Sequence, residues 1–297
     1  MDCLRCFSER RFSPYSGLKL APEKVNQILT CLVEGNSVRS TERMTDTHRD
    51  TILRVLVMAG ERCERLLEDR IKNVPVKDVQ CDEVWGFCGK KEGHKWMFEK
   101  DREDIGDAYC FVAIERHSKV VLAWHLGRRD KKATEAFVEK LRTATDENRF
   151  QVTTDGFRPY VDAIDTALVD RVDFAQLVKV YATSNETEHR YSPGEVAGAI
   201  PSTITGNPDP LRICTSHVER QNLSIRMGMR RLTRLTNAFS KKWENLKAAY
   251  ALWFAWYNFG RIHRTLRMTP AMQANLTDHI WDIEELLQAG KELERAA

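Results

Sequence analysis

The order of strand and helix patterns between residues 79 and 181 is the feature that most limits how this chain can fold. Short runs rich in β-branched and aromatic residues occur five times, and two amphipathic helical patterns separate the last three of them. The expected strands are Val79–Trp85, Tyr109–Ile114, Val120–Leu126, Gln151–Thr154 and Phe174–Tyr181, and the expected helices are Lys132–Thr143 and Val161–Leu168. This order predicts an α/β (α+β) fold with a mixed five-stranded sheet flanked by helices.

Length and composition narrow the class of protein further. The chain has 297 residues, of which 42% are hydrophobic, so a packed core is available and a disordered chain or a disulfide-stapled miniprotein is excluded. No run approaches the ~18 apolar residues of a membrane helix, and the N-terminus lacks an apolar signal core. Eight irregularly spaced cysteines then fit reduced thiols. We therefore expect a cytoplasmic protein without membrane contact.

Three short helical patterns precede the sheet. They lie at Val25–Leu32, at Val38–Met44 and from Ile52 to Gly60, with a tight polar turn before the third. This pattern predicts a helix-turn-helix DNA-binding domain over residues 20–62. The residues at the start of its third helix that would contact DNA are His48, Arg49 and Arg54. A small helical bundle with solvated polar residues is an equally good interpretation of the same segment.

The remaining segments complete the expected domain organisation. Residues 63–78 are charged and predict a helical linker, and residues 79–275 form the expected α/β domain. Residues 182–211 are polar and rich in proline and glycine, which predicts a long loop. The acidic amphipathic helix at residues 276–297 is compatible with either dimerisation or docking onto the rest of the chain.

Three carboxylates occupy positions where acidic side chains are informative. Asp82 lies inside an expected strand, Asp155 directly follows another, and Glu219 lies near the start of an expected helix. Each has a simpler explanation: a surface carboxylate on an edge strand, a turn residue before Gly156, or a capping-box glutamate three residues after Ser216.

Taken together, the three carboxylates suggest a metal site. Like charges at short range raise each other's pKa, and divalent cations remove that conflict. Two such cations held by carboxylate oxygens about 3.5–4 Å apart support phosphodiester chemistry. Because side chains alternate along a strand, at most one of Asp82 and Glu83 is expected to reach a shared site.

Several motifs resemble those of a known family. They are Cys81-Asp82-Glu83-Val84-Trp85, Thr154-Asp155-Gly156, the run from Ser216 to Arg226 (SHVERQNLSIR), Tyr257-Asn258-Phe259, Arg261-Ile262-His263-Arg264-Thr265-Leu266 and Thr269-Pro270. The chain thereby resembles the DDE transposases of bacterial insertion sequences, most closely the insertion-sequence-one family, over roughly residues 1–275. The resemblance implies a ribonuclease H-like catalytic domain in which Asp82, Asp155 and Glu219 bind two Mg²⁺ or Mn²⁺ ions.

The resemblance also implies a function. Such an enzyme binds the terminal inverted repeats of its own element, cuts DNA there and joins the freed 3′-hydroxyl to target DNA, usually as a homo-oligomer and in contact with the nucleoid. Two alternatives stay open: an inactive DNA-binding regulator derived from a transposase, and a nuclease of the same fold that cuts without joining.

The charge distribution supports a polyanionic partner. The whole chain carries only +3, but residues 212–267 carry twelve Lys and Arg against two Glu. Within that segment, Arg226 follows Glu219 by seven residues, nearly two helical turns, so both are expected on one helix face. We expect Arg226, Arg230 and Arg231 to contact DNA.

One departure from the family concerns zinc. Cys3 and Cys6, within residues 1–19, look like the remnant of a Cys-x-x-Cys ribbon. A closed structural zinc site needs four ligands, and these two supply only half of them. The sequence therefore does not establish a zinc site.

Overall fold

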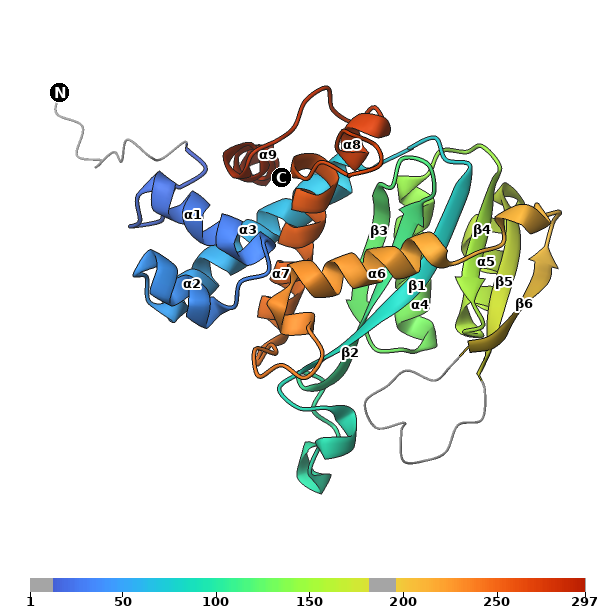
Figure 1. Cartoon of the computed structure of the whole chain (residues 1–297), viewed down its shortest axis with the longest axis horizontal. Coiled ribbons are helices and arrows are strands. Elements are labelled where there is room, and N and C mark those ends of the chain that lie inside the picture. Colours follow the sequence, from blue (N-terminus) through green and yellow to red (C-terminus); the bar gives the residue numbers. More distant parts are fainter. Residues whose placement is uncertain (1–12, 182–195, 297) are drawn as a thin grey trace. The chain divides into compact units, whose positions relative to one another are not determined.

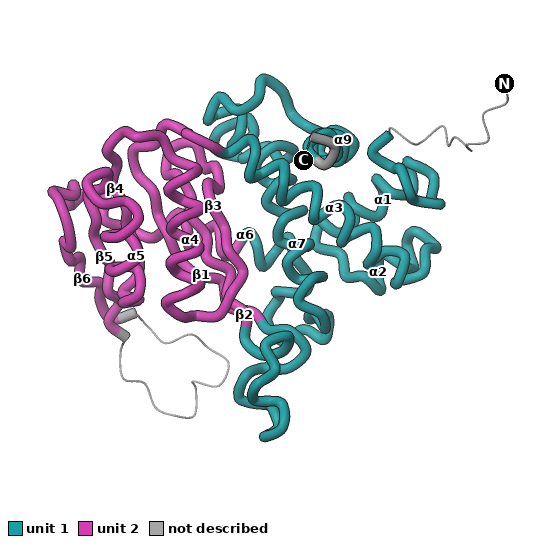
Figure 2. The backbone as a smooth tube through the Cα atoms, turned by 180° about the vertical axis from the view of Figure 1, so that it is seen from behind, with its two compact units in different colours: residues 1–71, 87–107, 224–297 teal, residues 72–86, 108–223 magenta. Residues whose placement is uncertain are grey.

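The computed structural model describes residues 13–181 and 196–296, which form two compact units. Residues 72–86 and 108–223 make up one, here called the sheet unit, and residues 1–71, 87–107 and 224–297 make up the other, here called the helical unit (Figure 2). Cys3 and Cys6 lie outside the described residues. The expected domain boundaries stay a prediction.

A six-stranded mixed sheet runs through the sheet unit, in the order β3-β2-β1-β4-β5-β6 (Figure 1). The pairs β1–β4 and β4–β5 are parallel, whereas β2–β3 and β5–β6 are antiparallel. The strands are β1 (Asp78–Cys88), β2 (Gly106–Glu115), β3 (Val121–Gly127), β4 (Phe150–Asp155), β5 (Val172–Tyr181) and β6 (Val196–Thr205). The five expected strands are all present.

The sixth strand corrects the expectation of a loop over residues 182–211. β6 pairs with β5 along nearly its whole length, with Pro201 opposite Leu177. Its residues are mostly small or polar, and Ile200 remains 59% exposed, so the strand has no apolar face that would reveal it in the sequence. Proline is tolerated there because β6 is an edge strand.

Helices cover both faces of this sheet. α4 (Lys131–Ala144) and α5 (Pro159–Leu168) pack together on one face, and residues 216–223 of α6 (Ser216–Gly228) cross the other (Figures 1 and 2). The buried rings of Phe111, Phe137 and Tyr160 lie 5.6–6.3 Å apart between sheet and helices. The expected mixed α/β fold is thus confirmed, and it is consistent with a ribonuclease H-like fold extended by one strand.

The helical unit is built around one long helix. Its helices are α1 (Pro22–Val33), α2 (Val38–Thr45), α3 (Arg49–Arg70), α7 (Trp243–Ala255), α8 (Pro270–Gln273) and α9 (Ile283–Ala296). α3 does not end at Gly60 as expected. A side-chain carbon at Gly60 would lie 2.5 Å from the Ala248 Cβ of α7, so this glycine permits close helix packing rather than ending the helix.

Short turns and the C-terminal helix complete the chain. The 3₁₀ turns are Glu92–His94, Met97–Glu99, Val169–Arg171, Pro210–Arg212 and Arg230–Leu232, and Trp256–Gly260 forms a π-helical turn. α9 packs on α3, where Gly290 meets the Arg62 backbone. Docking within the chain is therefore observed for this helix. Among the described residues, no helix is long and apolar enough to cross a membrane.

Candidate active site

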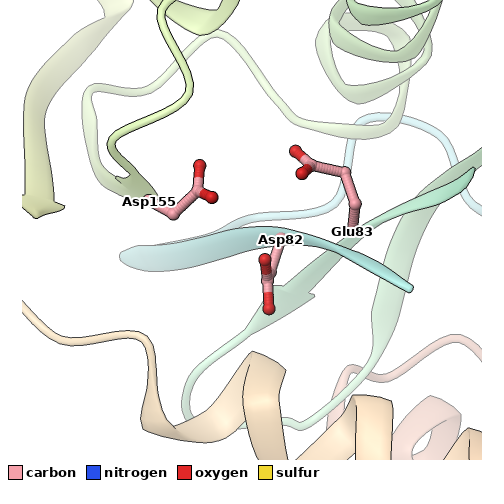
Figure 3. Close-up of side chains that lie close together, drawn as sticks. All are labelled: Asp82, Glu83 and Asp155. Atoms are coloured by element: carbon pink, nitrogen blue, oxygen red, sulfur yellow. The ribbon is translucent and has the colours of Figure 1, made fainter. Parts of the chain in front are cut away.

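Asp82 and Asp155 lie side by side on two parallel strands. β1 and β4 pair with Gln80 opposite Thr153. Extending that register by two residues places Asp82 opposite Asp155, the last residue of β4. One carboxylate oxygen from each of Asp82, Glu83 and Asp155 lies within 4.8 Å of the others; we call these three residues the acidic cluster (Figure 3). The structure thus brings together two of the three carboxylates selected from the sequence.

Glu83 belongs to this acidic cluster, although strand alternation argues against it. Figure 3 shows the Asp82 side chain leaving β1 on the opposite side from Glu83, as alternation requires. An oxygen of each nevertheless lies within 4.8 Å of the other, and the expectation that at most one of them reaches a shared site stays a prediction. β4 ends at Asp155, so carboxylates from both faces can meet around the end of that strand.

Asp82 is half-buried among other carboxylates. Burial raises its pKa to about 7, and the negative charges of Glu83, Asp155 and Glu219 add to the shift. Its Oδ2 accepts a hydrogen bond of 2.8 Å from Nδ2 of Asn222 on α6. The alternative of a carboxylate on an edge strand is wrong, because β1 lies between β2 and β4.

Both oxygens of Asp155 have partners within the chain. The backbone amide of Phe157 donates to Oδ1 at 2.9 Å, so the turn role considered for Asp155 is real and coexists with its place in the acidic cluster. Nη2 of Arg129 donates to Oδ2 at 3.2 Å. Gln176 on β5 donates to the Asp155 carbonyl oxygen at 2.9 Å, which ties the end of β4 to its neighbour.

Glu219 lies on α6, outside the 4.8 Å limit of the acidic cluster. Its Oε1 accepts from Lys179 Nζ at 2.6 Å and from the hydroxyl of Thr215. The carboxylate is 41% exposed, yet it is close enough to Asp82 for its charge to raise the Asp82 pKa. The three sequence-selected carboxylates therefore gather in one region of the sheet unit, with Glu219 held by a lysine.

Gln80 connects this region to α6, a role that motif reasoning did not identify. Its Oε1 accepts the backbone amides of His217 and Val218 at 2.9 and 3.2 Å, so the side chain caps the start of α6. Gln80 precedes Asp82 by two positions and therefore shares its face of β1. The sequence does contain a signal for this role: Gln80 is a polar residue on a buried strand, two positions before a candidate catalytic aspartate.

The donor set suits a hard divalent cation. Carboxylate oxygens are the ligands that Mg²⁺ and Mn²⁺ prefer, and crowded carboxylates give the site a repulsion that a cation would relieve. Asn222 adds a further oxygen: its Oδ1 is buried and has no hydrogen-bond partner among the described residues. The residues present thus fit a divalent metal.

Predicted DNA-binding residues from two distant segments line one cavity inside the helical unit. The cavity measures about 870 Å³ and is lined by Arg49 of α3 and by Arg230 and Arg231, which follow α6. Arg39 and Lys241 also line it, whereas Asp50 is its one acidic lining residue, and Leu56 and Trp253 are among its apolar ones. We call Arg39, Arg49, Arg230 and Lys241 the basic rim; all four are exposed, and none has an ion pair with a described residue.

Arg231 differs from the basic rim. Its Nη1 donates to Ser240 Oγ at 2.8 Å and to the Asn245 carbonyl at 2.9 Å. Burial lowers its pKa to about 10. These contacts hold the segment between α6 and α7 together, so a structural role accompanies the DNA contact predicted for it.

The other predicted DNA contacts lie outside that cavity lining. His48 caps α3, its Nδ1 accepting from the Asp50 amide at 3.3 Å, while Arg54 is exposed and donates to Thr51. Arg226 is half-buried on α6 and donates to the Leu232 carbonyl at 3.2 Å. DNA contacts by these residues stay predictions.

One comparison with known proteins matches part of the chain. A family model named DDE_Tnp_IS240, described as a DDE domain, matches residues 105–193, which include Asp155 but neither Asp82 nor Glu219. This match supports a DDE transposase domain. The narrower likeness to the insertion-sequence-one family stays a prediction.

Curated proteins and solved structures add little to this match. No curated protein matches the chain. Among the solved structures that do, a piggyBac transposase synaptic complex with hairpin DNA is 11% identical, with a TM-score of 0.29 over 85% of this chain. The chain covers 56% of the length of that transposase.

Proposed function

We propose that this chain is a DDE transposase that binds the terminal inverted repeats of its own insertion sequence and catalyses DNA cleavage and strand transfer. The observation that carries the proposal is the gathering of Asp82, Asp155 and Glu219. The first two lie in the acidic cluster, and the charge of the third raises the Asp82 pKa. The match of residues 105–193 to a DDE domain supports the same conclusion.

Asp82, Asp155 and Glu219 would hold two Mg²⁺ or Mn²⁺ ions. Bound there, divalent cations activate an attacking oxygen and stabilise the leaving oxygen of a phosphodiester. Asn222 orients Asp82, and the Phe157 amide orients Asp155. Lys179 holds Glu219. These contacts limit the reorganisation required of the carboxylates, which is how positioning contributes to phosphoryl transfer.

The basic rim supports DNA as the partner. Exposed cations that form no ion pair with a described residue favour a polyanion, and the attraction weakens with salt. Arg49 belongs to the expected helix-turn-helix and Arg230 to the segment after Glu219. Two segments that lie far apart in the sequence would therefore contribute to one DNA-binding surface. In the reaction, water would attack a phosphodiester at each element end and release a 3′-hydroxyl. That 3′-hydroxyl would then attack a phosphodiester of the target DNA.

The test uses the full chain, Mn²⁺ and duplexes bearing the inverted repeats found beside its gene. Asp82→Asn, Asp155→Asn and Glu219→Gln should each reduce strand cleavage by at least about 1,000-fold while leaving duplex binding within about 3-fold. Asp162→Asn is the matched control, because Asp162 is an exposed carboxylate on α5. Full cleavage by any one of the three variants would contradict the assignment.

The same assay separates the remaining functions. Joining of precut ends to target DNA is expected of a transposase. Cleavage without joining would indicate a nuclease instead, and binding without cleavage would indicate a DNA-binding regulator.

A further inference from the structure

One oxygen of Glu83 is bound to a partner within the chain, whereas its buried Oε1 has no hydrogen-bond partner among the described residues. Its side chain is only 4% exposed, and its Oε2 accepts from Nε of Arg129 at 2.9 Å. It leaves β1 on the side opposite Asp82 (Figure 3). Asn222, the partner of Asp82, lies on α6. Closeness alone therefore does not make Glu83 a metal ligand.

Arg129 joins Glu83 to Asp155. While its Nε reaches Glu83, its Nη2 reaches Asp155 Oδ2 at 3.2 Å. Its Cζ lies 4.0 Å from the centroid of the Phe157 ring, and the Phe157 amide holds the other Asp155 oxygen. A planar guanidinium stacked on a ring and bonded at two edges has little freedom, so it fixes the orientation of Asp155.

Arg129 by itself would oppose metal binding. A permanent positive charge on a metal-ligating carboxylate competes with a divalent cation for the same negative charge. Glu83 offsets that charge at 2.9 Å, so the Arg129–Glu83 pair is neutral as a unit. Asp155 thus gains an orienting contact without losing its negative charge.

We propose that Glu83 and Arg129 form a charge-neutral positioning pair that orients Asp155 for metal binding, and that Glu83 is not itself a ligand. This rests on the proposed function only in requiring Asp155 to bind the metal. Removing Glu83 alone leaves an uncompensated cation beside Asp155. Removing both partners restores the charge balance and loses only the orientation.

A double-mutant cycle on the full chain tests this, with Mn²⁺ as the probe and its dissociation constant measured by calorimetry. Glu83→Gln should weaken Mn²⁺ binding at least about 10-fold, whereas Glu83→Gln combined with Arg129→Gln should recover to within about 3-fold of the unmodified chain. Asp155→Asn should weaken binding at least about 10-fold in either background. Thermal unfolding without metal verifies that each variant folds.

The control pair is Glu139 and Arg142, an exposed ion pair of 3.1 Å on α4. Its double glutamine variant should bind Mn²⁺ like the unmodified chain. If the double variant at Glu83 and Arg129 binds as weakly as Glu83→Gln alone, Glu83 is a ligand and the pair proposal is overturned while the proposed function stands. Absence of Mn²⁺ binding by the unmodified chain would overturn both.

Discussion

The acidic cluster in the sheet unit and the basic rim in the helical unit differ in whether their charged side chains have ion-pair partners. In the sheet unit, Arg129 offsets Glu83 and contacts Asp155, while Lys179 offsets Glu219. In the helical unit, the four cations of the basic rim are exposed and have no ion pair with a described residue. Charges that must keep a fixed geometry have partners within the chain. Cations that bind a long, mobile polyanion bind it more strongly when no acidic side chain of the chain already pairs with them.

The largest expected effect tests whether the basic rim contributes to DNA binding and not to metal binding. Replacing Arg39, Arg49, Arg230 and Lys241 together by alanine should weaken duplex binding about 100-fold or more near 0.1 M salt and lower the slope of log K against log salt by about 2–4. Mn²⁺ binding should not change. Fluorescence anisotropy at several salt concentrations measures the first effect and calorimetry the second.

The control for that experiment is alanine at Lys131, Lys132 and Arg142, which removes three exposed cations from α4. Duplex binding should fall much less in this variant. Equal losses in both variants would mean that total charge, rather than the basic rim, governs binding.

A packing change tests the helical unit by itself, because Gly60 and Ala248 both belong to it. Gly60→Val would place a side chain within 2.6 Å of Ala248 atoms, so we expect a loss of about 2–3 kcal/mol in the free energy of unfolding. DNA binding should weaken because α3 carries Arg49 and α7 contributes to the cavity wall. Denaturant unfolding and anisotropy measure the two effects, and an unchanged unfolding free energy would contradict the packing argument.

The smallest effect concerns the acidic cluster without metal. The pKa of Asp82, raised to about 7, means that the folded state holds this proton more tightly than the unfolded chain, where the value is near 3.8. The free energy of unfolding in EDTA should therefore decrease as pH rises from about 4 to 7 and level off above. At about 1.4 kcal/mol per pKa unit and with partial solvent screening, we expect roughly 1–3 kcal/mol.

Asp82→Asn provides the reference for that measurement, since it removes the titrating group. In thermal unfolding, the unmodified chain should lose stability relative to this variant as pH rises from about 4 to about 7, the interval between the pKa of Asp82 in the unfolded chain and in the folded protein. Parallel pH curves for the two proteins would show that burial does not perturb Asp82.

Much of the sheet unit could be predicted from local patterns, and the exceptions have physical causes. Strands with an apolar face were recognised within a few residues, but β6 was missed because an exposed edge strand needs no apolar alternation. Glycine lowers helix propensity, so the sequence predicts a helix end at Gly60, whereas the structure explains this glycine by close contact with Ala248. Strand alternation predicts that Asp82 and Glu83 point to opposite faces of β1. It does not predict how close their carboxylate oxygens come to Asp155, where the neighbouring strand β4 ends.

The sequence by itself determined the order of strands and helices and the positions of Asp82, Asp155 and Glu219 on a strand, at a strand end and on a helix. It did so because hydrophobic periodicity and chain order are local properties. Only the tertiary structure decided that Arg129 bridges Glu83 and Asp155, that Lys179 holds Glu219, and that Arg49 and Arg230 line one cavity. Such partners lie far apart in the chain, and strand register and helix packing select them.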